Sequence, residues 1–133
     1  MRCSNRFDPD RPADVAARAV VHASVEVHKQ LGPGLLESVY ESCLAYELVS
    51  AGVQLTRQSW IPFTYKGHHE PRAFRIDLVV DRVLIVEVKA VPMLLPIHHA
   101  QLRTYLRLAK LRVGLLLNFN VRLMKDGIVR IAL

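Results

Sequence analysis

Two apolar runs, AFRIDLVV at residues 73–80 and RVLIVEVKAV at residues 82–91, constrain the fold of this chain more than any other feature. Both have the length and the Val, Ile and Leu content of buried strands, and the short polar stretch Asp81-Arg82 joins them. Two such runs with so short a connection predict a β-hairpin at the centre of a sheet.

Three charged residues interrupt these apolar runs. Glu87 and Lys89 are two residues apart, so a strand places both side chains on one face. Burying an unpaired charge costs several kcal/mol, so these groups must pair with each other, reach water or bind a ligand. A register with Asp77 opposite Glu87 brings all three groups to one face and requires an odd-length loop or a bulge. A perfect two-residue turn at Asp81-Arg82 would separate them.

Two carboxylates beside a lysine have a known chemical use. Carboxylate oxygens bind Mg²⁺ or Mn²⁺, and a neighbouring ammonium group can position a water molecule for attack on phosphorus. The alternative is structural: Lys89 forms an internal ion pair with Asp77 or Glu87 and binds nothing else.

The remaining sequence predicts a single mixed α/β domain over residues 1–133, with residues 1–11 as a flexible N-terminal segment. Helical spacing of apolar residues predicts helices over residues 11–30, 35–52 and 97–110. Gly52 stands where a left-handed helix cap is usual. Further strands are expected over residues 53–58, 60–67 and 113–119, with a turn at residues 67–71, and Asp126-Gly127 predicts a hairpin turn before the last strand. The expected order is α-α-β-β-β-β-α-β-β.

Composition narrows the classes of partner. The chain carries 18 Lys and Arg against 12 Asp and Glu, a net charge of +6, which favours a polyanionic partner. No stretch approaches the roughly 18–20 apolar residues of a membrane-spanning helix, and the start has no apolar segment typical of secretion, so we expect no membrane association and a cytoplasmic protein. Cys3 and Cys43 form no zinc or disulfide pattern.

Asp77 followed by Glu87-Val88-Lys89 resembles the core motif of the PD-(D/E)XK nuclease superfamily. The stretch GLLESVY, residues 34–40, is similar to the motif that names the GxxExxY protein family of that superfamily. The similarity extends over nearly the whole chain, through YKG, QLRTYL, GLLLNF and DGIVR. The resemblance implies a restriction-endonuclease-like α/β core, with a mixed central sheet flanked by helices, and a metal-dependent nuclease activity that some members have lost.

The resemblance also implies roles for individual residues. Asp77 and Glu87 would hold Mg²⁺ or Mn²⁺, and Glu37 would complete the metal's ligands or orient them. Lys89 would act with them in catalysis by positioning the attacking water. Glu37 starts a helical stripe with Tyr40, and its alternative reading is a glutamate favoured by the helix dipole. Three residues are expected to support the site or contact the substrate: Gln101 and Tyr105, which resemble a QxxxY element, and Tyr40.

The function we expect is metal-dependent phosphodiester hydrolysis of nucleic acid, DNA or RNA. The alternative is a catalytically silent nucleic-acid- or protein-binding module that keeps the nuclease fold. A homodimer or a partner protein is expected to help select the substrate. Five arginines are expected to hold the phosphate backbone: Arg103, Arg107, Arg112, Arg122 and Arg130.

Overall fold

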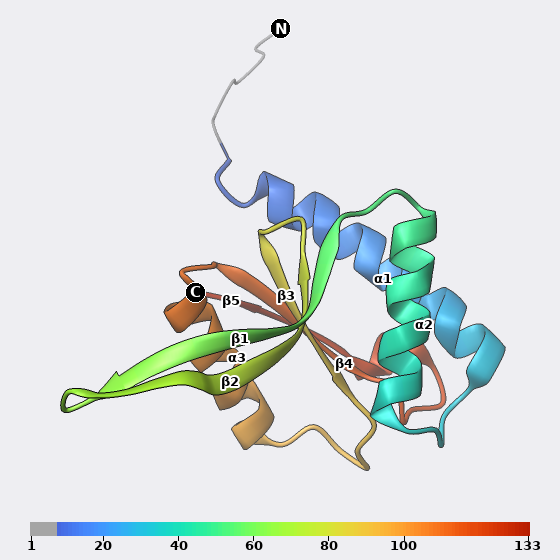
Figure 1. The fold of residues 1–133 in the computed structure, drawn as a ribbon. Coiled ribbons are helices and arrows are strands. Elements are labelled where there is room, and N and C mark those ends of the chain that lie inside the picture. The colour runs from blue at the N-terminus through green and yellow to red at the C-terminus, as the bar shows by residue number, and fades with distance from the viewer. Residues whose placement is uncertain (1–7) are drawn as a thin grey trace, which may run out of the picture.

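The computed structural model describes residues 8–133, which form three α-helices, one 3₁₀ helix and five strands (Figure 1). Their bounds in chain order are α1 Arg11–Leu31, α2 Glu37–Ser50, β1 Leu55–Tyr65, β2 His68–Val80, β3 Leu84–Lys89, α3 Pro96–Ala109, β4 Val113–Asn118, η1 Met124–Gly127 and β5 Ile128–Ala132. The three expected α-helices are therefore confirmed, and Gly52 has the left-handed φ of 79° expected after α2. Among the described helices, none has both the length and the apolar content needed to cross a membrane.

The five strands form one mixed sheet in the order β1-β2-β3-β4-β5. β3 and β4 run parallel, joined by α3, and the other neighbouring pairs run antiparallel. A parallel pair needs such a crossover, because a short turn reverses the chain direction. The expected fold class, a mixed central sheet flanked by helices, is confirmed.

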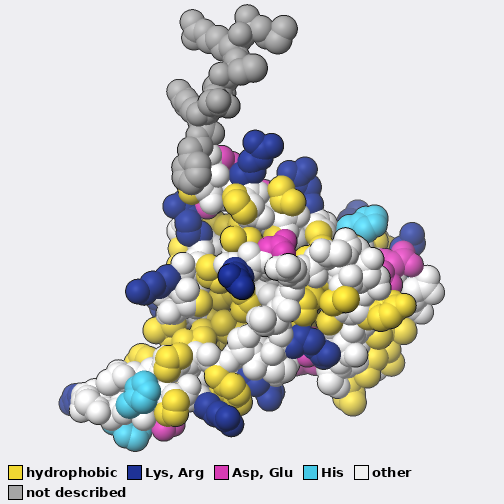
Figure 2. Space-filling view, turned by 45° about the horizontal axis from the view of Figure 1, so that its top comes forward, with side chains coloured by type: hydrophobic (Ala, Val, Ile, Leu, Met, Phe, Trp, Pro, Cys, Tyr) yellow, Lys and Arg dark blue, Asp and Glu magenta, His cyan; other side chains and the backbone are white. Residues whose placement is uncertain are grey.

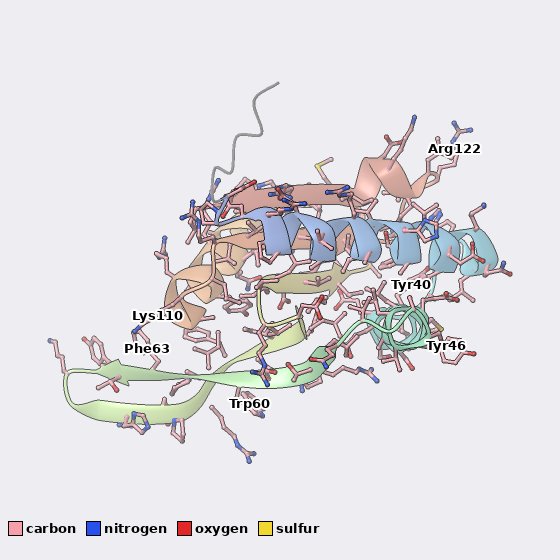
Figure 3. All side chains as sticks on the ribbon, turned by 90° about the horizontal axis from the view of Figure 1, so that it is seen from above. Tyr40, Tyr46, Trp60, Phe63, Lys110 and Arg122 are labelled. Atoms are coloured by element: carbon pink, nitrogen blue, oxygen red, sulfur yellow. The ribbon has the colours of Figure 1, made fainter. Side chains whose placement is uncertain are left out.

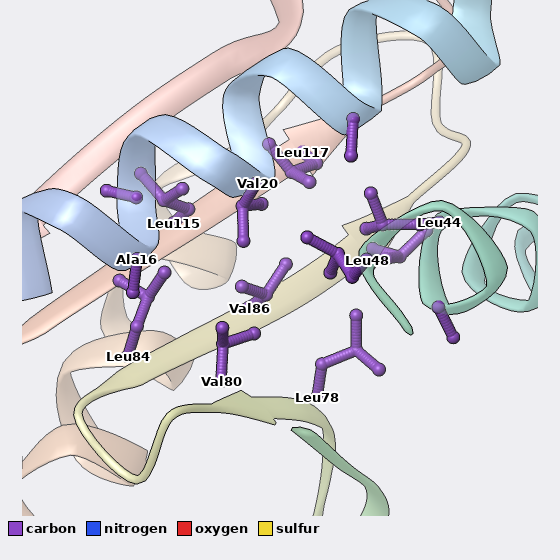
Figure 4. Close-up of a cluster of buried hydrophobic side chains, with 14 of the residues drawn as sticks. Ala16, Val20, Leu44, Leu48, Leu78, Val80, Leu84, Val86, Leu115 and Leu117 are labelled. Carbon is purple, nitrogen blue, oxygen red and sulfur yellow. The ribbon is translucent and has the colours of Figure 1, made fainter. Parts of the chain in front are cut away.

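Helices cover both faces of this sheet and create two apolar cores. On one face, α1 and α2 pack on the larger core, where Val20 and Leu48 meet Leu78 and Val86 (Figure 4). On the other face, α3 packs through Leu102 and Leu106 on the smaller core. Because β3 is covered on both sides, its residues from Leu84 to Val88 are all buried, which makes the charge of Glu87 exceptional.

The register of the central hairpin is the one that the charged residues required. Leu78 pairs with Val86 and Val80 with Leu84, so Asp77 lies next to Glu87 just beyond the paired residues. The loop contains Asp81, Arg82 and Val83, an odd number, and the first two have positive φ values of 50° and 59°. The predicted odd-length loop is confirmed.

The prediction of separate strands at residues 53–58 and 60–67 is wrong, because β1 is one strand from Leu55 to Tyr65. Gln58 has a left-handed φ of 54°, yet β1 keeps the same register with β2 on both sides of it, and the register shifts only between Ile61 and Phe63. The predicted turn at residues 67–71 is shorter than expected: Lys66 and Gly67 make it, and His68 already belongs to β2. The resulting β1–β2 hairpin projects beyond the rest of the sheet (Figure 1).

The predicted hairpin turn at Asp126-Gly127 is also wrong. Residues Met124–Gly127 form the 3₁₀ helix η1, and β5 follows directly. Gly127 is required here by close packing, since a Cβ atom at this position would lie 2.0 Å from the backbone oxygen of Asn118. The sequence pattern indicated a glycine that allows a turn, whereas in the structure the missing side chain allows Gly127 to pack closely against the backbone.

The N-terminal part of α1 is attached to the rest of the fold. Asp10, the residue before α1, forms a 2.8 Å ion pair with Arg112 at the start of the segment leading to β4. Residues 1–7, which include Cys3 and most of the expected flexible segment, lie outside the described residues.

Candidate functional site

Asp77 and Glu87 form a pair of carboxylates on neighbouring strands. The Asp77 N–H donates to Glu87 Oε1 at 3.1 Å, and the Val88 N–H donates to Asp77 Oδ2 at 2.8 Å. β2 and β3 stop pairing at Leu78 and Val86, so these backbone N–H groups have no partner in the sheet and the carboxylates accept them instead. The opening between the two strands therefore holds both carboxylates in place.

The pair lies in an environment that opposes two negative charges. Burial raises the pKa of Glu87 to about 8, and the nearby Asp77 charge adds to the rise, against the hydrogen bond from Asp77 and the Lys89 charge. Burial also raises the pKa of Asp77, which the hydrogen bond from Val88 opposes. Two such carboxyls are stable together when a proton or a cation neutralises part of their charge.

Lys89 lies on the same face of β3 as Glu87, one alternation further along. Its positive charge lowers the pKa of both Asp77 and Glu87, so the ammonium group is near the pair. Within residues 8–133, however, the four ion pairs do not include Lys89. The alternative of a structural ion pair between Lys89 and the carboxylates is therefore not what the structure contains.

Four hydrogen bonds fix the chain that leaves β3. The Lys89 carbonyl accepts from the Phe119 N–H at 2.9 Å, and the Ala90 N–H donates to Glu37 Oε1 at 3.2 Å. Asn118 then binds both backbone groups of Val91, at 3.1 Å and 3.0 Å. Glu37, the first residue of α2, thus lies at the end of the strand that carries Glu87 and Lys89.

Sequence reasoning missed a buried carboxylate near the pair. Glu41 of α2 forms a 2.8 Å ion pair with Arg57 and accepts a 2.5 Å hydrogen bond from Gln58. Its negative charge helps to raise the pKa of Asp77. The available signal was its position, one turn after Glu37 and next to the buried Tyr40.

Of the other expected site residues, one is buried and supports the fold, and two lie at least partly at the surface. Tyr40 is fully buried, stacks on Phe119 with ring centroids 4.5 Å apart, and donates a 2.6 Å hydrogen bond to the Gly32 carbonyl, so it ties the loop before α2 to the core. Gln101 is exposed on α3 and Tyr105 is half-buried. Burial raises the pKa of Tyr105, with further contributions from Glu87 and then Asp77, which places its phenol near the carboxylate pair.

Two of the five expected backbone-binding arginines have partners within the fold. Arg112, just before β4, pairs with Asp10, just before α1, and Arg130 of β5 pairs with Asp14 of α1. Arg103, Arg107 and Arg122 are exposed. Arg112 and Arg130 are exposed as well, so all five remain on the surface although these two have an acidic partner.

The chemistry of the carboxylate pair fits a hard divalent cation. Among the described residues, no group of three or more His, Cys, Asp and Glu side chains is arranged to hold a metal ion. Mg²⁺ is commonly held by only one or two protein carboxylates, with waters and substrate phosphates completing its coordination. Asp77 and Glu87 supply that number of carboxylates, and their raised pKa values show that added positive charge is favourable there.

A mixed α/β sheet that brings two carboxylates and a lysine together at the ends of its central strands defines a class of protein with an acidic, cation-compatible site. The sequence profile of the PD-(D/E)XK nuclease superfamily matches residues 14–131, and the chain belongs to this superfamily. Nucleases of this superfamily typically use divalent metals. No curated protein and no solved structure matches the chain.

Proposed function

We propose that this protein hydrolyses phosphodiester bonds in nucleic acid with the help of Mg²⁺ or Mn²⁺. The observation that carries the proposal is the pair formed by half-buried Asp77 and buried Glu87. Each accepts a backbone N–H from the other's strand, and Lys89 lies on the same face as Glu87 and outside any ion pair of the described residues. A structural cluster would pair its lysine, whereas a site for a phosphate and a cation leaves the ammonium group available.

The residues divide the work by their chemistry. Asp77 and Glu87 would hold the cation, which would neutralise negative charge on the phosphate. Lys89 would position the attacking water and stabilise the charge that develops on the phosphate oxygens. Tyr105, near the carboxylate pair, and Gln101, which lines the same groove on α3, would contact the strand that is cut.

Glu37 would orient the site through the backbone. The sequence left open whether it completes the metal ligands or orients them, and its hydrogen bond to the Ala90 N–H supports the second role. Glu41 would adjust the charge at Asp77 from α2, while Arg57 and Gln58 hold its carboxylate in place.

Several finer features belong to the same proposal. The GLLESVY motif supports membership of the GxxExxY family, and the basic composition supports a nucleic-acid substrate. We further propose a single domain over residues 1–133, a cytoplasmic location, and a homodimer or partner protein that helps to select the substrate.

The test is cleavage of labelled DNA and RNA, single-stranded and duplex, in EDTA, Mg²⁺ and Mn²⁺. We expect cleavage only with a divalent metal, and a loss of at least about 100-fold in Asp77→Asn and in Lys89→Met. The matched controls are Asp126→Asn and Lys125→Met in η1, both exposed, which should keep full activity.

Two results would contradict the proposal. Equal cleavage by the variants and the wild type would trace the activity to a contaminant. Binding of nucleic acid without cleavage in any metal would identify the protein as the silent binding module instead.

A further inference from the structure

The β1–β2 hairpin extends well past the site, and its outer part has no use in the proposed chemistry. β2 pairs with β3 only from Leu78 to Val80, so residues 59–76, here called the hairpin arm, have no neighbouring strand on that side. The arm projects from the body of the protein, with hydrophobic, basic and histidine side chains on its surface (Figures 1 and 2). A long exposed hairpin of this kind is costly to keep unless it binds something.

One face of the arm carries an aromatic row that leads to the carboxylate pair. Phe63 and Phe74 lie edge to face with centroids 6.0 Å apart, and Phe74 and Tyr105 are 5.8 Å apart. Phe63 is 42% exposed. In Figure 3, Phe63 lies on the side of the arm toward Lys110, the residue that follows α3, and Trp60 lies on the opposite side.

A groove lies at the inner end of this row, between the arm and α3. It has a volume of about 190 Å³ and is lined by Phe74, Ile97, Ala100, Gln101, Thr104 and Tyr105. This is below the roughly 300–1,000 Å³ of pockets for drug-sized ligands, so the groove suits one ring system. Phe74 from the arm faces the α3 side chains of Tyr105 and Gln101, and two aromatic rings with an amide are suited to a flat, hydrogen-bonding ring.

The charge around the groove favours a polyanion. The sequence of α3 contains Arg103 and Arg107 and no acidic residue. Arg107 donates a 3.3 Å hydrogen bond to the Thr104 hydroxyl, which holds its guanidinium at the rim of the groove. On the arm, Lys66 lies 5.5 Å from the Tyr65 ring. A phosphate backbone following this rim would meet positive charge while its bases faced the aromatic row.

We propose that the groove between the hairpin arm and α3 binds an unpaired stretch of nucleic acid, stacking a base on the row formed by Phe63, Phe74 and Tyr105. The proposal rests on the proposed nuclease function and names its substrate as single-stranded, or as a duplex with an unpaired end. A fully paired duplex does not satisfy the groove, because its base faces are covered by neighbouring base pairs. The base held beside Tyr105 brings the next phosphate to Asp77 and Glu87.

The test measures binding in EDTA, so that it does not depend on cleavage. Fluorescence anisotropy compares a labelled single strand, a blunt duplex of the same sequence, and the same single strand with abasic sites. We expect the single strand to bind most tightly and Phe63→Leu to weaken it about ten-fold, the size of one stacked base. Phe63→Tyr, which keeps the ring, should bind as the wild type does.

The matched control is Tyr46→Leu, which removes an aromatic ring that is 71% exposed on α2, away from the arm. It should bind all three probes as the wild type does. Thermal unfolding of each variant checks that Phe63→Leu remains folded.

The proposal is overturned if Phe63→Leu weakens the duplex and the single strand equally, if it changes neither, or if the abasic strand binds as tightly as the normal one. The proposed nuclease function fails separately, when the single strand binds as expected and no divalent metal produces cleavage. Cleavage of blunt duplex that Phe63→Leu leaves unchanged would support the nuclease and overturn the groove.

Discussion

Glu87 governs how the site responds to pH at the scale of single residues. Its ordinary pKa of 4.5 rises to about 8 in the folded protein, chiefly through burial. Between these values the folded protein keeps a proton that the unfolded chain has released. The free energy of unfolding therefore falls as pH rises from about 4.5 to about 8, and the raised pKa of Asp77 acts in the same direction.

Glu87→Gln should flatten this pH dependence. The neutral amide cannot ionise, so the variant avoids the cost of a buried charge and should be more stable than the wild type near pH 8, by on the order of a few kcal/mol. Urea unfolding in EDTA at about pH 5 and about pH 8 measures the effect. Glu70→Gln, an exposed glutamate on the arm, is the control and should keep the wild-type dependence. An unchanged slope in Glu87→Gln would contradict the buried, protonated carboxyl.

A divalent cation should replace the proton. Mg²⁺ or Mn²⁺ near pH 8 should raise the Tm by several degrees, because it binds only the folded carboxylate pair. The shift should disappear in Asp77→Asn and in Glu87→Gln. Thermal unfolding with and without metal measures the shift in Tm, and adding EDTA should reverse it.

Glu37→Gln separates orientation from metal binding. A glutamine oxygen can still accept the Ala90 N–H, so this variant should keep most of the metal-dependent rise in Tm, whereas Glu37→Ala should lose site order and activity. A Glu37→Gln protein that loses the rise in Tm completely would instead make Glu37 a metal ligand, as the resemblance first implied.

At the scale of secondary-structure elements, the sequence predicted those features that depend on residues close together in the chain. The strand register followed from Asp77, Glu87 and Lys89, because a slip of one residue would move a whole set of side chains to the other face. The environment of Glu41 could not be predicted, since its partners Arg57 and Gln58 come from a different element. The left-handed backbone of Gln58 carries no sequence pattern either, so one long strand was read as two.

Two glycines test how tightly the elements hold the site. Gly127→Ala should be strongly destabilising, because its Cβ would meet the Asn118 carbonyl, part of the backbone that fixes the end of β3. Gly114→Ala should cost less, about 1–3 kcal/mol, because its Cβ would meet the flexible end of Leu102 at 2.8 Å. Denaturant unfolding ranks the two, and the opposite order would contradict the close approach at Gly127.

At the scale of the whole molecule, the fold separates stability from substrate binding. The two apolar cores lie in the body of the protein, and the arm contributes to them only near its base, through Ile61, Phe74 and Ile76. The chain as a whole has a net charge of +6, whereas its candidate site contains the acidic residues Asp77 and Glu87. Positive charge away from the carboxylates attracts nucleic acid, and a divalent cation is then needed to bring a phosphate onto them.

Shortening the arm should therefore leave the fold intact and weaken binding. Replacing residues 63–72 with Asn-Gly keeps Ile61 paired with Phe74 across a two-residue turn. Because Ile61 and Phe74 stay in place, the Tm should change by only a few degrees. Binding of a single strand in EDTA should weaken, and the slope of log Kd against log salt should fall by about 0.7 for each phosphate that Lys66 and Arg72 no longer neutralise.

The matched control for the shortened arm is Arg18→Gln on α1, which removes one exposed positive charge, the same net change as losing Lys66, Arg72 and Glu70 together. If the arm guides the strand, the control should lose less affinity than the shortened protein, and its preference for single strands over duplex should remain. Equal losses in both proteins would mean that only net charge attracts the nucleic acid. The outer part of the arm would then need another explanation, because residues 63–72 belong to neither core.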